Sequence, residues 1–369
     1  MDKVKSATFF FLLLCTQSQF FNYFLGLKLA VMAPVVVLCF LILVYCEYEY
    51  ILLFIKEYFF ILLFLLPSLF INANQAIAAL LKLSVFYSLI TSNSKFVSIT
   101  VRLFVTVLCL SCVLTFFWSI LHLPVRKIEI LDGEHNELFN LTRYIEMSPF
   151  GASEPSELAF NRIFGLFGEP SEAVFFLFPF LYHYFYKKQY YLVGLIFAAM
   201  CFTGSASLVF LFLLMLLTIV TSKQIKAVKR VYIALIALML LIGFIALFWN
   251  QLMNRLFSFG SSEIQISRVV TLTAFFENKG NVGVADFAAP NSLILFAFNL
   301  PILLLPLFID LRNRFRNLPD GYSRLVFFLL LLFQSLVSTA YYESLPFYFL
   351  ASRKTDPEND SNNMAKITI

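Results

Sequence analysis

The sequence predicts an all-α, polytopic integral membrane protein with two long extracytoplasmic loops and about 11–13 transmembrane helices. Of its 369 residues, 60% are hydrophobic and only 13% are charged, whereas about a quarter of the residues of a soluble domain are charged. A soluble chain of this length has too little interior to bury so much apolar surface. The apolar residues also recur in runs close to the about 20 residues that a helix needs to cross a bilayer.

The apolar runs favour helices over the strands of a barrel, because they are nearly continuous and do not alternate with polar residues. The spans predicted in the first half are 7–24, 29–46, 51–72, 75–92 and 99–121. The spans predicted in the second half are 172–186, 190–203, 206–221, 231–249, 291–310 and 323–341, followed by a short apolar segment at 344–352. This last segment either completes a crossing or only dips into the membrane. Thr203-Gly204-Ser205 divides two of the runs.

Two long polar segments separate the predicted groups of helices. The predicted parts are N-terminal transmembrane helices at 1–121, a first outer loop at 122–171, central transmembrane helices at 172–249, a second outer loop at 250–290, C-terminal transmembrane helices at 291–352 and a polar cytoplasmic tail at 353–369. Loops of this length are uncommon without a role, which favours a binding or catalytic use for both.

Lysine and arginine residues indicate which ends of the spans face the cytoplasm. The basic residues beside the spans are Lys3, Lys5, Lys95, Arg102, Lys187, Lys188, Lys223, Lys226, Lys229, Arg230, Arg312, Arg314, Arg316, Arg324, Arg353 and Lys354. With the predicted spans they all fall on one side, so both termini are expected in the cytoplasm and both long loops outside. The net charge of +5 is therefore a topology signal, and nucleic-acid binding has no support.

Common cofactor and metal motifs are missing from the sequence. It has no P-loop, dinucleotide fingerprint, HExxH or GxSxG pattern. Cys109 and Cys112 form a CxxC inside an apolar run with no polar ligand nearby, which favours helix packing over a metal or redox site. The histidines His122, His135 and His183 are scattered, so a zinc site is not expected.

Few ionisable residues fall within the predicted spans, and Lys82 is the most deeply placed of them. An ionisable group at membrane depth suggests a functional role. The alternative is that these ionisable side chains extend to the membrane interface, and this interpretation is favoured for Lys82, Lys56 and Glu57. Acidic residues do not recur across several spans as they do in a proton relay, which weakens the case for an ion-coupled transporter.

The segment NRIFGLFGEPSEAVFF, where the first outer loop meets the next span, is the main candidate for chemistry. Arg162 and Glu169 lie seven residues apart, and Gly165, Gly168 and Pro170 predict a turn or broken helix between and beside them. An arginine there could bind a phosphate through two hydrogen bonds. A glutamate could act as a general base or orient a sugar hydroxyl. The alternative is that the two side chains only pair with each other at the interface.

The outer loops contain further candidate binding residues. Glu154 and Glu157 belong to an earlier copy of the letters EPSE, and they would place more acidic groups near a sugar site. Arg268 of the second loop precedes a bend at Gly280-Asn281-Val282-Gly283. Two arginines on one face would suit a pyrophosphate. The sequence leaves open whether Arg162 and Arg268 converge.

These residues resemble a known family. The pattern Arg-x-x-Gly-x-Phe-x-Glu-Pro-Ser, then a span, then a Thr-Gly-Ser-type break falls here on Arg162, Gly165, Phe167, Glu169, Pro170, Ser171 and Thr203-Gly204-Ser205. It is similar to that of the Wzy-type O-antigen and capsule polymerases, which belong with the O-antigen ligases to one superfamily of polytopic, GT-C-like glycosyltransferases. Arg268 and its bend match the family's later motif loosely, with one residue more between the glycines. Ligases often carry a His-Asn pair where this chain has Pro290-Asn291, which favours a polymerase.

The resemblance implies an enzyme that joins undecaprenyl-pyrophosphate-linked oligosaccharide repeat units without a metal or other cofactor. Arg162 and Arg268 would bind the pyrophosphate, and Glu169 would position or deprotonate the acceptor hydroxyl. Gly165, Ser171, Glu154 and Glu157 would contribute to substrate binding. The implied location is the bacterial inner membrane, with the lipid bilayer, a chain-length regulator and a flippase as further partners. The alternatives are an O-antigen ligase and a lipid-linked oligosaccharide flippase or transporter.

Overall fold

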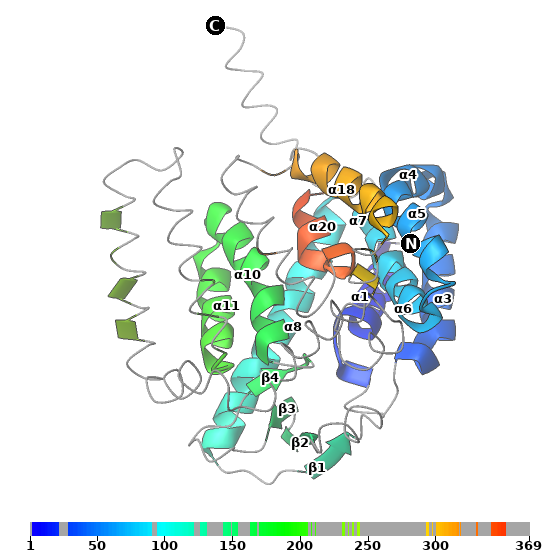
Figure 1. Ribbon diagram of the computed structural model, residues 1–369. Helices are drawn as coiled ribbons and strands as arrows, with labels where there is room; N and C mark the ends of the chain where they lie inside the picture. The colour runs from blue at the N-terminus through cyan, green and yellow to red at the C-terminus, as the bar shows by residue number, and fades with distance from the viewer. Residues whose placement is uncertain are drawn as a thin grey trace, which may run out of the picture.

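The computed structural model describes most of the N-terminal half of the chain and selected parts of the rest. The described residues are 2–21, 29–90, 94–121, 126–130, 143–148, 150–153, 163–167, 170–205, 208, 211, 231–232, 235, 238–239, 242–243, 293–294, 297, 300–316, 318, 330 and 341–351. Figure 1 shows their helices side by side in a bundle, with a small sheet at the end opposite α4 and α18.

Helices make up most of the described chain, as predicted. The N-terminal elements are α1 (Asp2–Gln17), α3 (Leu29–Cys46), η1 (Tyr48–Tyr50), α4 (Ile51–Glu57), α5 (Phe59–Ser68), α6 (Ala73–Leu83), η2 (Ser84–Phe86), α7 (Tyr87–Ile90) and α8 (Ser94–Ile120). The later helices are α10 (Pro170–Tyr186), α11 (Tyr190–Phe202), α18 (Pro301–Phe315), η3 (Tyr341–Glu343) and α20 (Leu345–Ala351). Helix α1 packs against α3 and α8, α11 packs against α8 and α10, and α18 packs against α5.

Within the described residues, two helical stretches are long and apolar enough to cross a membrane. They are Ala73–Ile90 and Phe96–Trp118, with mean hydropathies of 1.4 and 2.3. A third becomes possible if Val31–Cys46 and Tyr48–Glu57, which meet at an angle of 100°, count as one bent span. The chain therefore has membrane-spanning character, while the larger number of crossings stays a prediction.

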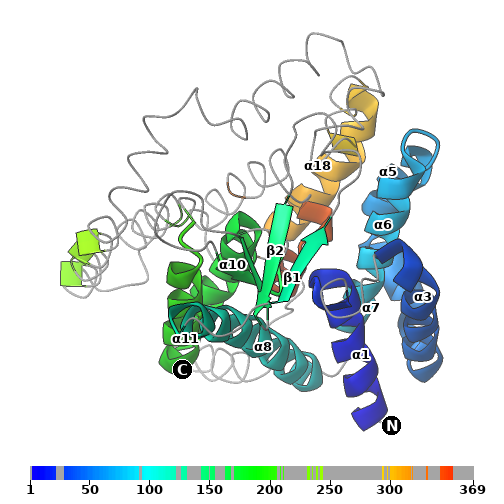
Figure 2. The same cartoon turned by 90° about the horizontal axis from the view of Figure 1, so that it is seen from below.

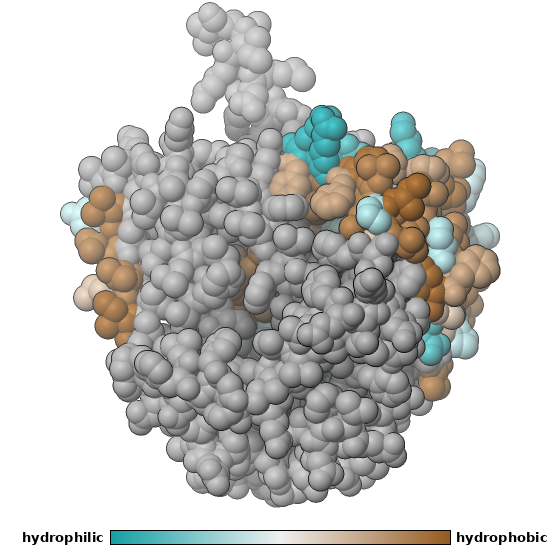
Figure 3. Space-filling model, in the orientation of Figure 1, coloured by the Kyte–Doolittle hydropathy of each residue, from teal (hydrophilic) through white to brown (hydrophobic). Residues whose placement is uncertain are grey.

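The outer surface of the helices also suits a lipid environment. Large apolar side chains lie exposed on α3, α4 and α5, and they form much of the brown area at the right of Figure 3. Exposed members of this surface are Val31, Val37, Leu38, Leu41, Leu52, Ile55, Phe59, Leu63 and Leu66. Contiguous apolar surface of this kind marks contact with a membrane or another protein. Together with the two apolar spans, it supports association with a membrane.

Two predicted spans are interrupted in the structure. The span at 51–72 is divided at Tyr58 into α4 and α5, because the Tyr58 backbone (φ −106°, ψ 14°) departs from helical geometry. The span at 291–310 is interrupted at Leu300, and α18 begins at Pro301. Proline suits the first helical position because it has no N–H group to leave unpaired. Local backbone geometry at Tyr58 and Leu300 thus interrupts helices that the hydropathy pattern alone makes continuous.

The predicted break at Thr203-Gly204-Ser205 is confirmed. Helix α11 ends at Phe202, and Gly204 has a φ of +60°, a conformation that glycine adopts at little cost. The Thr203 hydroxyl donates a hydrogen bond to the Met200 carbonyl at 2.7 Å and accepts one from the Ser205 amide at 3.3 Å. The hydroxyl therefore satisfies backbone groups that the end of the helix leaves unpaired.

The predicted first outer loop contains a sheet, so the all-α prediction holds for the described apolar segments and not for this one. The antiparallel strands, in spatial order, are β1 (Arg126–Ile130), β2 (Arg143–Ser148), β3 (Phe150–Ser153) and β4 (Ile163–Gly165). Figure 2 shows β1 and β2 in front of the helices when the bundle is seen from below. The sequence of β1 alternates basic or acidic residues with Ile128 and Ile130, a period-two pattern that predicts a strand.

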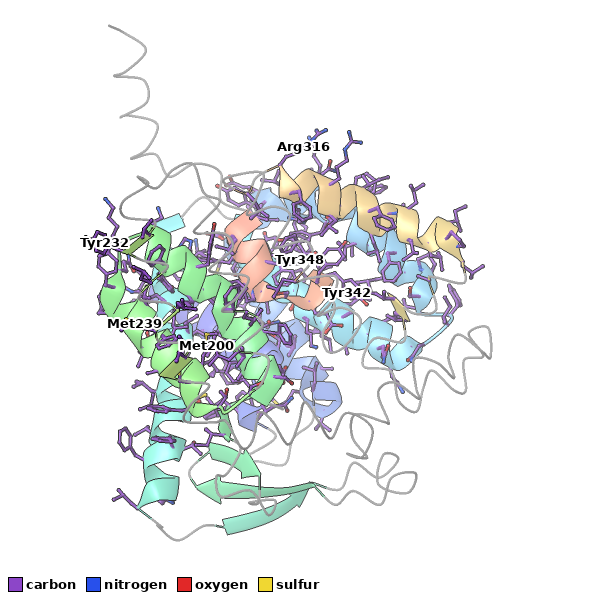
Figure 4. The ribbon with its side chains drawn as sticks, turned by 60° about the vertical axis from the view of Figure 1, so that its left-hand side comes forward. Met200, Tyr232, Met239, Arg316, Tyr342 and Tyr348 are labelled. Carbon is purple, nitrogen blue, oxygen red and sulfur yellow. The ribbon has the colours of Figure 1, made fainter. Side chains whose placement is uncertain are left out.

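A buried arginine joins the C-terminal helices to the N-terminal ones. The Arg314 Nε atom lies 3.1 Å from an oxygen of Asp310, and its Nη2 atom donates a hydrogen bond to the Glu57 carbonyl at 2.8 Å. The guanidinium carbon lies 4.4 Å from the ring centres of both Tyr58 and Tyr348. In Figure 4, Tyr348 lies within the bundle whereas Arg316, two residues beyond Arg314, points outward.

Replacement of Arg314 is expected to destabilise the fold strongly. In the Arg314→Ala variant, Asp310 would keep a buried charge without its ionic partner, which costs about 3–5 kcal/mol. The midpoint of thermal unfolding should therefore be lower than in the wild type. Unfolding of the solubilised protein can be followed with a thiol-reactive dye that detects exposure of its buried free cysteines. Arg312→Ala is the matched control, because Arg312 is exposed on the same helix. Equal midpoints for the two variants would contradict the structural role of Arg314.

Candidate functional site

A cavity of about 180 Å³ lies where the ends of α1, α6, α10 and η3 meet. Its lining residues are Cys15, Thr16, Gln17, Ser18, Gln19, Phe21, Leu29, Met32, Lys82, Phe167, Glu172, Phe176, Glu343 and Ser344. Concave sites that combine apolar walls with a few polar groups are typical of small-molecule binding. The cavity is therefore the candidate functional site of the described chain.

The charged part of the lining consists of one lysine and two glutamates from three distant segments. Lys82 Nζ of α6 forms an ion pair with Glu343 Oε2 of η3, and their side chains are 23% and 15% exposed. Glu172, in the first turn of α10, also attracts Lys82 electrostatically. The formal charge of these three groups is −1, because two carboxylates face one ammonium group.

This arrangement changes the interpretation of Lys82. The sequence favoured a lysine that extends to the membrane interface. In the structure Lys82 pairs with a glutamate 261 residues further along the chain, and its depth in a membrane stays a prediction. Lys56 and Glu57, by contrast, are exposed as that interpretation expects. An ionisable pair inside an apolar bundle marks a functional site more often than a surface pair does.

The end of α1 supplies uncharged polar groups to the same cavity. Gln17 Nε2 is buried and donates no hydrogen bond to any described residue. The Thr16 hydroxyl donates to the Leu12 carbonyl at 2.8 Å, and the Ser18 hydroxyl donates to the Leu14 carbonyl at 2.7 Å. Gln17 therefore contributes a polar residue to the lining, while its amide nitrogen is buried beside it.

The motif segment reaches the cavity through a tight turn after β4. Gly165 has a φ of +56°, and a side chain at this position would lie 2.8 Å from Cys112 Sγ on α8. Next along the chain, the Leu166 amide donates to Ser111 Oγ at 3.1 Å, and the Leu166 carbonyl accepts from the Gln19 amide at 2.8 Å. These contacts fix the turn between α1 and α8. Phe167 and, in the first turn of α10, Glu172 then lie in the cavity wall.

The predicted site residues fall into two groups. Gly165 and Ser171 are described: Gly165 packs against α8, and Ser171 lies in the first turn of α10 beside Glu172. Arg162, Glu169, Arg268, Glu154 and Glu157 lie outside the described residues. Their predicted roles, and the convergence of the two arginines, stay predictions.

The sequence interpretation missed Glu172 and Glu343 as members of the site. Each had a recognisable signal, because Glu172 follows the Pro170-Ser171 pair of the motif and Glu343 separates two apolar segments. A lone carboxylate at the end of a span is a functional candidate by its position. What the sequence does not contain is the packing that brings η3 beside α6.

Comparison of the chain with protein-family models, with curated proteins and with solved structures gave no match. The functional argument therefore rests on the residues of this chain and on the cavity that they line.

Substitution of Gly165 is expected to disturb the docking of the motif. In Gly165→Ala, the methyl group meets α8 and the positive φ is unfavourable, which together cost at least about 1–2 kcal/mol. Gly194→Ala is the matched control, because a methyl group there meets nothing within 4 Å and alanine favours a helix over glycine by about 1 kcal/mol. Thermal unfolding midpoints should fall for the first variant and hold or rise for the second. An unchanged midpoint for Gly165→Ala would show that the turn is not tightly held.

Proposed function

We propose that this protein is a polymerase of lipid-linked oligosaccharides at the outer face of the bacterial inner membrane. It would join undecaprenyl-pyrophosphate-linked repeat units into an O-antigen, a capsule or another exopolysaccharide. The observation that carries the proposal is the position of the described part of the motif: its turn at 165–167 is held between α1 and α8, and Phe167 and Glu172 line a charged cavity. A segment chosen from the sequence for its chemistry thus borders the cavity in the described chain.

The predicted topology supports an outer location for this cavity. The end of α1, the start of α10 and the residues between the last two apolar segments all lie on the outer side in that topology. These are the elements that supply Gln17, Glu172 and Glu343 to the lining. The sheet of the first outer loop lies at the opposite end of the bundle from α4 and α18 (Figure 1), and α18 ends in the basic residues expected in the cytoplasm.

The proposed reaction is a displacement at the sugar carbon that carries the pyrophosphate. The acceptor hydroxyl of one lipid-linked repeat unit attacks this carbon of the growing chain and forms the new glycosidic bond. The bond from the same carbon to the pyrophosphate oxygen breaks, and the lipid pyrophosphate leaves. Arg162 and Arg268 would stabilise the negative charge of the leaving group. Glu169 would accept the proton of the attacking hydroxyl.

A flippase or transporter is the second candidate. The specific observation in its favour is the Lys82–Glu343 pair within the bundle, because ion pairs between helices often line transport pathways. An O-antigen ligase, which transfers the finished polymer to another acceptor, would share the chemistry of the polymerase and differ in the acceptor.

Deletion of the gene in its native host distinguishes the candidates. For a polymerase, we expect the polysaccharide ladder to disappear on electrophoresis. Single repeat units should still be transferred or should accumulate on undecaprenyl pyrophosphate. Full-length polymer stranded on its carrier would indicate a ligase. Repeat units trapped on the cytoplasmic side would indicate a flippase. An unchanged ladder would refute the proposed function.

Variants of the two motif residues test their roles directly. Arg162→Ala should abolish the polymer while the protein still accumulates in the membrane, because the leaving group loses its counter-charge. Glu169→Gln keeps the size of the side chain and removes its basicity, so it should slow polymerisation by about 10²–10⁴-fold. Lys56→Ala, at an exposed position, is the control and should leave the ladder intact. Wild-type chain length in either motif variant would exclude the role assigned to that residue.

A further inference from the structure

We propose that the cavity binds one uncharged, hydroxyl-rich sugar ring of the acceptor repeat unit and that the pyrophosphate binds elsewhere. This inference rests on the proposed function and adds a subsite to it. The subsite is formed by Gln17, Lys82, Glu172 and Glu343 with aromatic side chains beside them. None of these four residues belongs to the motif positions on which the resemblance to polysaccharide polymerases depends.

The charge of the lining decides against a phosphate. Two carboxylates, Glu172 and Glu343, face one ammonium group, and Lys82 is already paired with Glu343. A pyrophosphate would bring further negative charge close to two carboxylates in a site with little water, where like charges repel strongly. An uncharged ligand meets no such repulsion. The lipid-linked substrate therefore places its sugar, and not its diphosphate, in this cavity.

The hydrogen-bonding groups of the lining match a polyol. Ionised carboxylates only accept hydrogen bonds, and each hydroxyl of a sugar can donate one. Gln17 adds a further polar residue to the lining. Hydrogen bonds to charged groups contribute about 1.5–3 kcal/mol each. A ring with several hydroxyls therefore suits the acceptor groups of the two carboxylates.

The size and the apolar walls of the cavity favour a single ring. Its volume of about 180 Å³ is smaller than the roughly 300–1,000 Å³ of pockets that enclose drug-sized ligands. Phe167 and Phe176 lie with ring centres 5.5 Å apart and, with Phe21, form part of the wall. Aromatic surfaces can contact the C–H groups of a sugar ring while polar groups bind its hydroxyls. The rest of the repeat unit would extend from the cavity.

Binding of the free oligosaccharide tests this assignment. The probe is the repeat-unit oligosaccharide of the native host, released from its lipid pyrophosphate by mild acid, and it is titrated into the full-length protein in lipid nanodiscs. The wild-type protein should bind it, and Glu172→Gln should weaken the binding by about ten-fold or more, the equivalent of about 1.4 kcal/mol. Inorganic pyrophosphate is titrated in parallel, and its affinity should not fall in this variant. Glu49→Gln, at an exposed position, is the control.

The ion pair requires a variant that separates binding from folding. Glu343→Gln leaves Lys82 with an unpaired charge and could destabilise the protein. The double variant Lys82→Met/Glu343→Gln removes both charges, so it should recover the thermal midpoint while oligosaccharide binding stays weak. A double variant that recovers both properties would show that the pair only stabilises the fold, and the subsite would be rejected.

The two proposals fail in different ways. The sugar subsite would be overturned if the wild type and Glu172→Gln bound the oligosaccharide with equal affinity. It would also be overturned if Glu172→Gln lost affinity for pyrophosphate and not for the oligosaccharide. In either case the ladder of the deletion strain still tests the polymerase. Wild-type protein that does not bind the oligosaccharide would also overturn the subsite. An unchanged ladder, together with oligosaccharide binding that Glu172→Gln weakens, would reject the polymerase and leave a sugar-binding membrane protein.

Discussion

The ion pair between Lys82 and Glu343 joins two distant parts of the chain, and both of its side chains are largely shielded from solvent. A lone ammonium group there would be costly, so α6 and η3 must meet if either charge is to be tolerated. Arg314 plays a similar part nearer the basic end of α18, where it links that helix to Tyr58 and Tyr348. Lys82 and Arg314 thus both form contacts between the N-terminal helices and the C-terminal elements α18, η3 and α20. Residues of η3 line the cavity together with residues at the ends of α1 and α10.

The motif turn shows how backbone geometry prepares a site. Gly165 allows β4 to end against α8, and the hydrogen bonds of Leu166 then attach the chain to α8 and α1. Both hydrogen bonds use backbone groups of Leu166, so they position the segment without using its side chains. Pro170 starts α10 immediately afterwards. Its first turn therefore has a defined direction, which brings Glu172 to the cavity.

Much of the helical framework could be predicted from hydropathy, because a continuous apolar run has few alternatives to a helix in a membrane. The runs at 99–121, 172–186 and 190–203 correspond to α8, α10 and α11. Hydropathy did not reveal the divisions at Tyr58 and Leu300, which depend on backbone conformation and proline. The strands were missed because short alternating segments give a weak signal within a polar loop. The partner of Lys82 could not be predicted, since nothing in a sequence pattern relates residues 261 positions apart.

The same separation has a consequence for biogenesis. Ribosomes add about 5–20 residues per second, so Glu343 is synthesised between about 13 and 52 s after Lys82, which precedes it by 261 residues. During this interval α6 has left the ribosome without the carboxylate that pairs with it in the finished protein. Contact with water or lipid headgroups would offset the cost of an unpaired Lys82 charge during this time. The charged cavity closes only after the last apolar segments arrive, which makes it one of the final features of the protein to form.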